Sequence, residues 1–292
     1  MAVPWQGLEL VLACSVAWSA LDLLRKRLMG AGIAPTPLLV VLAAGQMPVL
    51  GLWAATHSGH HLDAGYLLPG LGSVALNILA NLAFLEAMRI APLSLTVPLL
   101  SLTPVFTTLV AIPILGQVPS GRQLTGIALV VAGALLLHAG WAGTGAGFWR
   151  RVLHERGSLL MLGVALAWSL TMPLDRLALD SASPPIHALA LNGGVALGAL
   201  GVLASRGRLR ELGAVRRIPG LLALTLLVAA SAVGLQLLAI LEVPVGLVET
   251  IKRGFGSILA LLFGRLAFGE PLTAPGALAV LVMSGGVALI LL

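Results

Sequence analysis

The chain has 292 residues, of which 59% are hydrophobic and 10% are charged, and its formal net charge is +6. Water-soluble domains carry about 25% charged residues, so this composition excludes a soluble globular protein and indicates an integral membrane protein. A basic balance can indicate a nucleic-acid partner, but here the basic residues flank apolar stretches, so we expect no nucleic acid and no cofactor.

Ten apolar stretches of about 20 residues, the length that crosses about 30 Å of hydrocarbon as a helix, follow one another along the chain. Their residues do not alternate between apolar and polar, which argues against the strands of a membrane barrel. The first stretch lacks a basic leader and carries Asp22, so we do not expect it to be a removable signal peptide. The predicted spans are approximately Gly7–Met29, Pro35–Thr56, Tyr66–Ile90, Pro92–Leu115, Gly121–Trp141, Ser158–Leu179, Pro185–Ser205, Pro219–Leu241, Pro244–Phe268 and Leu272–Leu292.

Short sequences recur about 150 residues apart, such as Ala-Trp-Ser at residues 17–19 and 167–169. Each half holds an odd number of spans, so the second half enters the bilayer from the opposite face. We therefore predict an all-α membrane protein made of two inverted five-helix repeats, a pattern typical of secondary transporters with a solute site between the halves. The predicted first repeat covers residues 1–141, the linker 142–157 and the second repeat 158–292.

Basic residues are distributed unequally over the connections between spans. Most lie in odd-numbered connections, for example Arg25 to Arg27 and residues 206–217. The face that holds the even-numbered connections and both termini has Arg122 and Arg176. The positive-inside rule then places the odd connections in the cytoplasm and both termini outside.

The prolines of the fourth predicted span, including Pro98 and Pro104, are expected to kink it and to free backbone carbonyls. Hydroxyls such as those of Ser101 and Thr103 are close enough in sequence to bond these carbonyls, together with Ser94 and Thr96. The segment is either a bent packing helix or the wall of a cavity, and the sequence leaves both open.

The stretch from Pro92 to Phe106, followed by Gly116-Gln117, closely resembles one half of the EamA-type transporters in the drug/metabolite transporter superfamily. The second half shows the same resemblance through Glu249-Thr-Ile-Lys252-Arg253, then Gly269-Glu270, then Gly285-Gly286. The resemblance covers nearly the whole chain. It implies a ten-helix carrier that works by alternating access and exports small metabolites such as amino acids, often by proton coupling or exchange.

Two features depart from the family pattern. The family commonly has Gly-Glu after the fourth span, whereas this chain has Gln117, so a role for that carboxylate survives only at Glu270. Family members usually keep both termini in the cytoplasm, which is the reverse of the orientation that the basic residues indicate. Both orientations stay open.

Ionisable side chains inside a bilayer cost about 2.5 to 3.5 kcal/mol each on insertion scales, so each one needs a partner or a wet cavity. Asp22 precedes Arg25 and Lys26 by three and four residues and can pair with them along one helix face. It is either a structural ion pair near the interface or a carboxylate that contacts solute or changes protonation.

Glu249, Lys252 and Arg253 stand at i, i+3 and i+4 deeper within the ninth span, and both cations can reach the carboxylate. We expect Asp175 of the sixth span at comparable depth on the same side, where it would join a buried charge network. Such a network either locks the two spans together or holds an anionic group of the solute.

Polar and aromatic residues mark further candidate positions. Asn77 and Asn81 follow Ser73 at four-residue spacing, a stripe that forms interhelical hydrogen bonds or lines the solute pathway. Gln236 lies in the corresponding region of the other repeat, and Trp18 and Trp168 either pack or stack against solute. The candidate substrate-binding and pathway residues are therefore Trp18, Asp22, Asn77, Asn81, Ser101, Trp168, Asp175, Gln236, Glu249, Lys252 and Arg253.

The histidines at 57, 60 and 61 fit no standard metal motif, and no nucleophile and base are evident, so we predict neither a metal site nor an enzyme. The sequence predicts a multi-pass secondary carrier of a bacterial inner membrane that moves a small polar or charged solute, with a proton or counter-solute as a further partner. The alternatives are a lipid-headgroup flippase and, less favoured, an intramembrane lipid-modifying enzyme. The sequence also leaves a homodimer open.

Overall fold

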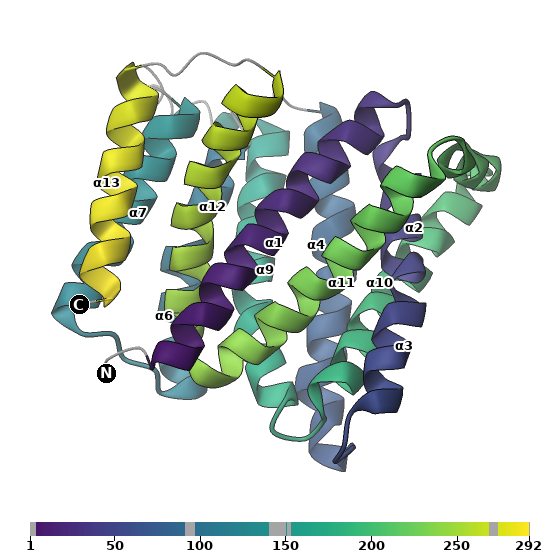
Figure 1. The fold of residues 1–292 in the computed structure, drawn as a ribbon, viewed down its shortest axis with the longest axis horizontal. Helices are drawn as coiled ribbons and strands as arrows, with labels where there is room; N and C mark the ends of the chain where they lie inside the picture. The colour runs from purple at the N-terminus through teal and green to yellow at the C-terminus, as the bar shows by residue number, and fades with distance from the viewer. Residues whose placement is uncertain (1–3, 91–96, 140–149, 151–152, 269–273, 292) are drawn as a thin grey trace.

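The computed structural model of the chain describes residues 4–90, 97–139, 150, 153–268 and 274–291. These residues form long helices packed side by side, with both ends of the chain at one face of the molecule (Figure 1). The helices are α1 (Trp5–Gly30), α2 (Pro35–Gly45), α3 (Met47–Thr56), α4 (Leu67–Ile90), α6 (Thr103–Leu115), α7 (Gly121–Ala139), α9 (Arg156–Ala178), α10 (Pro184–Ser205), α11 (Pro219–Glu242), α12 (Val245–Phe268) and α13 (Ala274–Leu291), with 3-10 helices η1 (Ala64–Tyr66), η2 (Val97–Leu102) and η3 (Leu209–Arg217).

Seven stretches in the described ranges are long and apolar enough to cross a membrane. Two shorter apolar helices, Leu99–Leu115 and Gly121–Leu137, stand at the predicted fourth and fifth spans, and α12 at the predicted ninth. The all-helical architecture is confirmed, whereas the count of ten spans remains a prediction. The seven stretches are Trp5–Gly30, Pro35–Thr56, Ala64–Ala87, Arg156–Ala178, Pro184–Ser205, Pro219–Glu242 and Ala274–Leu291.

Prolines shape two of the spans differently from the prediction. The second span is interrupted at Gln46, between α2 and α3, because Pro48, two residues further on, has no backbone N–H to donate. In the fourth span Pro104 stands in the first turn of α6, where proline is tolerated, rather than kinking a continuous helix. The Thr103 hydroxyl donates to the carbonyl of Leu100 at 2.6 Å, as the sequence suggests for carbonyls near prolines. Pro92, Ser94 and Thr96 lie outside the described residues.

Helices of the two halves exchange partners. The first helix of each half packs against the third helix of the other half, so that α1 lies against α11 and α9 lies against α4. The fourth helices, α6 and α12, pack together, and so do the fifth helices, α7 and α13, at one edge of the molecule (Figure 1). The main hydrophobic core therefore lies between the halves.

Glycines set the close approach of α7 and α13. A Cβ on Gly286 would lie 2.7 Å from the carbonyl oxygen of Gly126, and one on Gly133 would lie 2.9 Å from that of Ala279. The residue numbers run in opposite senses along this contact, so the two fifth helices are antiparallel, as inverted repeats require. Gly194 and Gly198 similarly admit Val74 and Ile78 of α4 against α10, which supports a packing role for this G-x-x-x-G pair.

A pair of hydrogen bonds reflects the internal symmetry. The Ser19 hydroxyl of α1 faces the carbonyl of Gly256 in α12 at 3.5 Å, and the Ser169 hydroxyl of α9 donates to the carbonyl of Thr103 at 3.2 Å. Ser19 and Ser169 are the serines of the two Ala-Trp-Ser repeats. The repeat in the sequence therefore corresponds to matching contacts in space.

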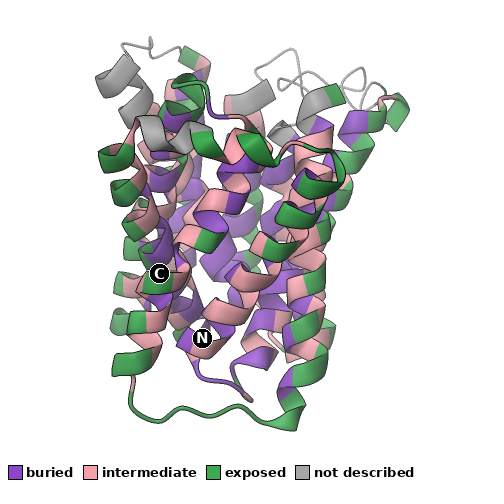
Figure 2. Ribbon diagram, turned by 90° about the vertical axis from the view of Figure 1, so that its right-hand side faces the viewer, coloured by how far each residue is buried: buried purple, intermediate pink, exposed green. Residues whose placement is uncertain are grey.

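Large apolar side chains also cover the outside of the bundle. Leu68, Leu197 and Leu281 are each at least 70% exposed, and exposed residues run along the outer faces of the helices around a buried centre (Figure 2). Such a surface is unfavourable in water and favourable in lipid. The molecule is an integral, multi-pass membrane protein.

The two ends of the bundle differ in the connections that they hold. The terminal face holds the start of α1, the end of α13 and the connections at residues 57–66, 116–120, 179–183 and 243–244 (Figure 1). The basic face lies at the other ends of the helices and includes the connection at residues 206–218.

Candidate solute-binding site

A charge cluster lies one to two turns inside α12 from the terminal face. The Glu249 side chain is 2% exposed, and Lys252 Nζ lies 2.5 Å from its Oε2 atom. Arg253 Nε donates to Glu249 Oε1 at 2.9 Å. The i, i+3 and i+4 spacing of one helix therefore brings the three groups together, as the sequence predicts.

Two other helices complete this cluster. Gln236 of α11 accepts a hydrogen bond from Lys252 Nζ at 3.0 Å. The centroid of the Trp18 ring in α1 lies 5.6 Å from Lys252 Nζ and 5.7 Å from the guanidinium carbon of Arg25. Both distances suit cation–π contacts. We call Trp18, Gln236, Glu249, Lys252 and Arg253 the Lys252 cluster, and it contains residues from both halves.

The Lys252 cluster carries one surplus positive charge, because Glu249 contributes −1 and Lys252 and Arg253 contribute +2. The side chains of Lys252 and Arg253 are 16% and 32% exposed, so their heads are not fully enclosed by protein. A surplus charge at this depth is costly without a partner. The cluster can therefore bind an anionic group that approaches Lys252 and Arg253.

Asp175 does not join the Lys252 cluster, and the expectation that it shares this network is wrong. Its Oδ1 atom accepts a hydrogen bond from the Ser73 hydroxyl of α4, and it lies 3.0 Å from Nε2 of His187 in α10. Asp175 is one turn from the end of α9, and the short connection to α10 returns the chain so that His187 faces it.

His187 in turn reaches the first half of the chain. Its Nδ1 atom lies 2.9 Å from the hydroxyl oxygen of Tyr66 in η1. The side chains of His187 and Asp175 are 0% and 3% exposed. We call Tyr66, Ser73, Asp175 and His187 the Asp175 cluster. It joins α4, α9, α10 and η1 close to the terminal face.

The asparagine stripe of α4 extends from the Asp175 cluster. Asn77 Nδ2 donates to the Ser73 carbonyl at 3.1 Å, and Asn81 Nδ2 donates to the Asn77 carbonyl at 2.8 Å. The bond between helices comes from Ser73, while the two amides bond back along their own helix and remain partly exposed. A pathway role for Asn77 and Asn81 stays a prediction.

The remaining candidates lie elsewhere. Asp22 pairs with Arg25 at 3.3 Å and its side chain is 72% exposed, which matches an interfacial ion pair. The Trp168 ring lies 5.5 Å from that of Phe84 in an apolar cluster, so it does not repeat the cation contacts of Trp18. Ser101 is buried in η2, and Glu270 lies outside the described residues.

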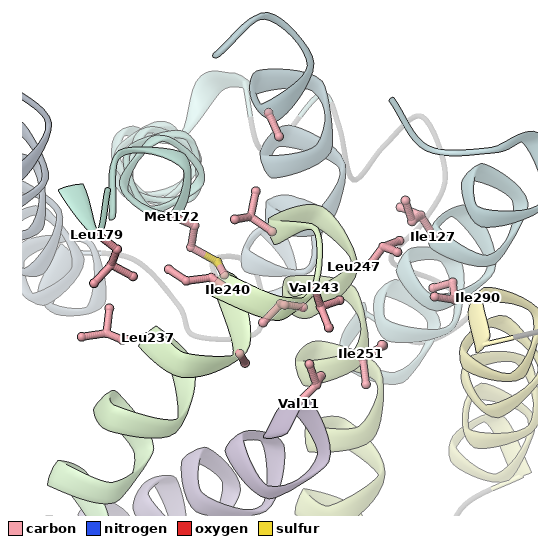
Figure 3. Packing of buried hydrophobic residues seen from close by; sticks show 14 of the residues in the cluster. Val11, Ile127, Met172, Leu179, Leu237, Ile240, Val243, Leu247, Ile251 and Ile290 are labelled. Atoms are coloured by element: carbon pink, nitrogen blue, oxygen red, sulfur yellow. The ribbon is translucent and has the colours of Figure 1, made fainter. Parts of the chain in front are cut away.

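A cavity of about 590 Å³ lies at the terminal face between the halves. Gly246 and Leu247 line it one turn before Glu249, and Arg176, the neighbour of Asp175, lines it from α9. The cavity therefore adjoins both clusters along the chain, although no residue of either cluster lines it. Ile240, Val243 and Leu247 line the cavity, and they belong to a buried apolar cluster with Met172 around the turn from α11 to α12 (Figure 3).

Two buried polar residues, His187 and Gln46, were not predicted from the sequence. His187 is absent from the predicted site because it lies at the end of a predicted span, although an ionisable residue beside an apolar helix start is a signal of a buried partner. Gln46 is 4% exposed at the break in the second span, where its amide donates to the carbonyl of Leu42 at 2.8 Å. A glutamine two residues before a proline inside an apolar run could have marked it.

Comparisons with known proteins place this architecture. The sequence profile described as the EamA-like transporter family matches residues 5–139 and again residues 155–292. The chain belongs to the EamA-like transporter family. Members of this family are membrane transporters of the drug/metabolite type, and the resemblance seen in the sequence is thereby confirmed.

Other comparisons bear on the fold of this EamA-like chain. A crystal structure of a protein shares 18% identity with it, superposes with a TM-score of 0.71, and is matched over 97% of this chain and 96% of that one. At this identity the likeness concerns the fold alone. A search of curated proteins finds no match.

Proposed function

We propose that this EamA-like protein is a secondary active carrier for a small solute that bears an anionic group, such as an amino acid or a related metabolite. The observation that carries the proposal is the Lys252 cluster, with its buried carboxylate, its surplus positive charge and its contributions from both halves. In this proposal the anionic group of the solute binds Lys252 and Arg253. Glu249 holds the two cations in place.

Contact with both halves supports alternating access. Lys252 belongs to the second half and Trp18 to the first. Motion of one half against the other therefore changes the surroundings of a solute bound at Lys252. The cavity at the terminal face, which Gly246 and Leu247 of α12 line, supports entry of the solute from that face. We further propose that the basic face is cytoplasmic, by the positive-inside rule, and that net movement is export.

A thermal-shift panel on the purified protein tests the solute class. The panel contains amino acids, sugar phosphates, nucleosides and amines, because a bound ligand stabilises the folded state. We expect stabilisation by members with a carboxylate or phosphate and none by simple amines. Stabilisation by amines alone would contradict the proposal, and transfer of a labelled lipid in vesicles without any soluble ligand would favour a flippase.

Substitution of Lys252 by alanine tests the site. Loss of this cation leaves Glu249 with one partner and removes the surplus charge, so we expect transport of the stabilising solute in reconstituted vesicles to fall below detection. Arg122→Ala, which removes an exposed cation at the start of α7, is the matched control and should transport normally. Both variants are first checked for folding by their elution in detergent. Normal uptake by folded Lys252→Ala protein would exclude Lys252 from the mechanism.

A further inference from the structure

The Asp175 cluster fulfils no role in the binding of an anionic solute, yet it buries a carboxylate and an imidazole side by side. His187 Nε2 lies 3.0 Å from Asp175 Oδ1, and both side chains are at most 3% exposed. Within the described ranges, His187 is the only basic side chain bonded to Asp175. The carboxylate thus has a positive partner only when His187 holds a second proton.

The hydrogen bonds of the cluster accommodate both states of His187. In the neutral state Nε2–H donates to Asp175 and Nδ1 accepts from the Tyr66 hydroxyl, whose oxygen lies 2.9 Å away. In the charged state both ring nitrogens donate, and the Tyr66 oxygen becomes an acceptor. One added proton therefore makes the pair electrically neutral without breaking the contact with Asp175.

The other charged side chains near α9 are either paired with another residue or far from Asp175. Arg176, which follows Asp175, pairs with Asp180 at 2.5 Å. The α6 and η2 segments packed on α9 have no titratable side chains, and α4 carries Glu86 and Arg89 at its opposite end, roughly 20 Å from Ser73 along the helix.

Among the described residues, the remaining elements packed on α9 add no partner for Asp175 either. The three ionisable residues of the Lys252 cluster on α12 bond one another. Glu242 of α11 is exposed at the rim of the cavity, and η1 contributes Tyr66 itself. The side chains of His61 and Asp63, in the connection before α4, are exposed. The charge of the Asp175–His187 pair is therefore set by its own protons.

Next to the pair, backbone hydrogen bonds join the two halves at the terminal face, and we call these bonds the closure. The N–H of Asp63 donates to the Ser181 carbonyl at 2.8 Å, and the N–H of Ser183 donates to the His61 carbonyl at 3.0 Å. These bonds, with the bridge between Leu62 and Ala182, join the connection before α4 to the one before α10. The Ser183 hydroxyl is buried here and has no hydrogen-bond partner in the described part of the chain.

We propose that Asp175 and His187 form a proton-binding site, and that release of this proton opens the terminal face of the carrier. On release, His187 Nδ1 gives its proton to water. The Tyr66 hydroxyl then turns and donates a hydrogen bond to Nδ1. The pair is then left with a net charge of −1 in a water-poor setting, which is costly. Entry of water, through opening of the closure, solvates both the carboxylate and the Ser183 hydroxyl.

This proposal rests on the proposed function, since it makes a proton the coupling ion of the same carrier. Binding of an anionic solute at Lys252 and release of a proton at Asp175 would then act on the same motion of the halves. The two ideas nevertheless concern different residues, so separate measurements can reject either one.

Accessibility of a cysteine under the closure tests the proposal. Ser183→Cys is made in a Cys14→Ala background, which removes the single cysteine of the chain. Its reaction rate with a maleimide is measured in detergent from about pH 5 to about pH 8. Each rate is divided by that of Val118→Cys, an exposed position on the same face, to remove the effect of thiol ionisation. We expect the ratio to rise with pH by about tenfold, an equilibrium shift worth about 1.4 kcal/mol.

Asp175→Asn is the decisive variant, because the amide keeps an acceptor for Ser73 and His187 but removes the negative charge. We expect its labelling ratio to stay low and flat with pH. A flat ratio in the parent protein, or an unchanged rise in folded Asp175→Asn protein, would overturn the proposal. If Asp175→Asn does not fold, a flat ratio in the parent protein would still overturn the proposal.

Solute binding separates this proposal from the function itself. Asp175→Asn should keep its thermal stabilisation by the anionic solutes of the panel, whereas Lys252→Ala should lose it. A pH-dependent closure without solute stabilisation would retain the proton site and reject the proposed solute, and the reverse result would reject the proton site alone.

Discussion

Lys252 makes three contacts that no other cation in the described residues combines: a buried carboxylate, an amide oxygen and an aromatic ring. The carboxylate contact is local in sequence and was predictable from the i, i+3 spacing. The amide and the ring come from α11 and α1, and sequence alone could only suggest them through their positions in the repeats. Asp175 shows the limit of such inference, because its partner Ser73 lies 102 residues away and no spacing rule reaches it.

The two repeat-related tryptophans provide a matched pair of variants. Trp18→Phe weakens the cation contact with Lys252, so we expect solute affinity to fall roughly two- to fivefold, as for a loss of about 0.5–1 kcal/mol. Trp168→Phe alters packing against Phe84 and should leave solute affinity unchanged. Titration calorimetry on both purified variants measures the difference. An equal loss in both would indicate that Trp18 acts through packing.

At the scale of elements, apolar length predicted where helices cross the membrane, while irregularities within the spans were harder to place. The interruption at Gln46 and the 3-10 start of the fourth span depend on how neighbouring helices accept the freed backbone groups. Those neighbours are distant in sequence. The prolines therefore marked the irregular spans but not their local geometry.

Adjacent glycines of α13 allow a sharp test of helix packing. Gly286→Ala places a methyl group against the backbone of α7, so we expect destabilisation by roughly 1–3 kcal/mol. Gly285→Ala points into open space and should be neutral or stabilising, since alanine favours helix. Thermal unfolding in detergent compares the two. Equal stabilities would show that α7 and α13 do not approach this closely.

An ion pair between Arg208, which precedes η3, and Glu211 within η3 has a predictable pH response. The hydrogen bond from Arg208, at 2.8 Å to Glu211 Oε2, lowers the pKa of Glu211. Stabilisation of η3 by this pair is therefore present above the ordinary glutamate pKa and is lost as pH falls through the lower folded value.

Amide hydrogen exchange measures this response. After correction for intrinsic exchange rates, we expect protection of η3 to decrease between about pH 6 and about pH 3 in the parent protein. Glu211→Gln should show low protection throughout, because the amide does not hold Arg208 by charge. Parallel pH profiles in the two proteins would show that the pair does not stabilise η3.

At the scale of the whole molecule, the repeat in the sequence predicted two related halves, and the family profile and the helix packing confirm that architecture. The exchange of partners between halves could not be derived, because apolar helix faces in lipid carry little information about which helix they meet. The orientation in the membrane likewise stays a prediction.

Labelling of single cysteines in intact cells determines that orientation. In a Cys14→Ala background, the positive-inside rule predicts that an impermeant thiol reagent labels Val118→Cys on the terminal face. It should not label Leu209→Cys on the basic face. The opposite pattern would favour the family habit of cytoplasmic termini, and labelling of both would indicate leaky cells and require permeabilised controls.

The pairing of α1 with α11 also concerns how the chain is made. The ribosome completes α1 at Gly30 and α11 only at Glu242, an interval of roughly 10 to 40 seconds at 5–20 residues per second. Throughout this interval α1, with its charged Asp22 and Arg25, lies in the bilayer without α11 beside it. Biogenesis of this protein therefore depends on membrane-insertion factors that protect the incomplete bundle until its second half is synthesised.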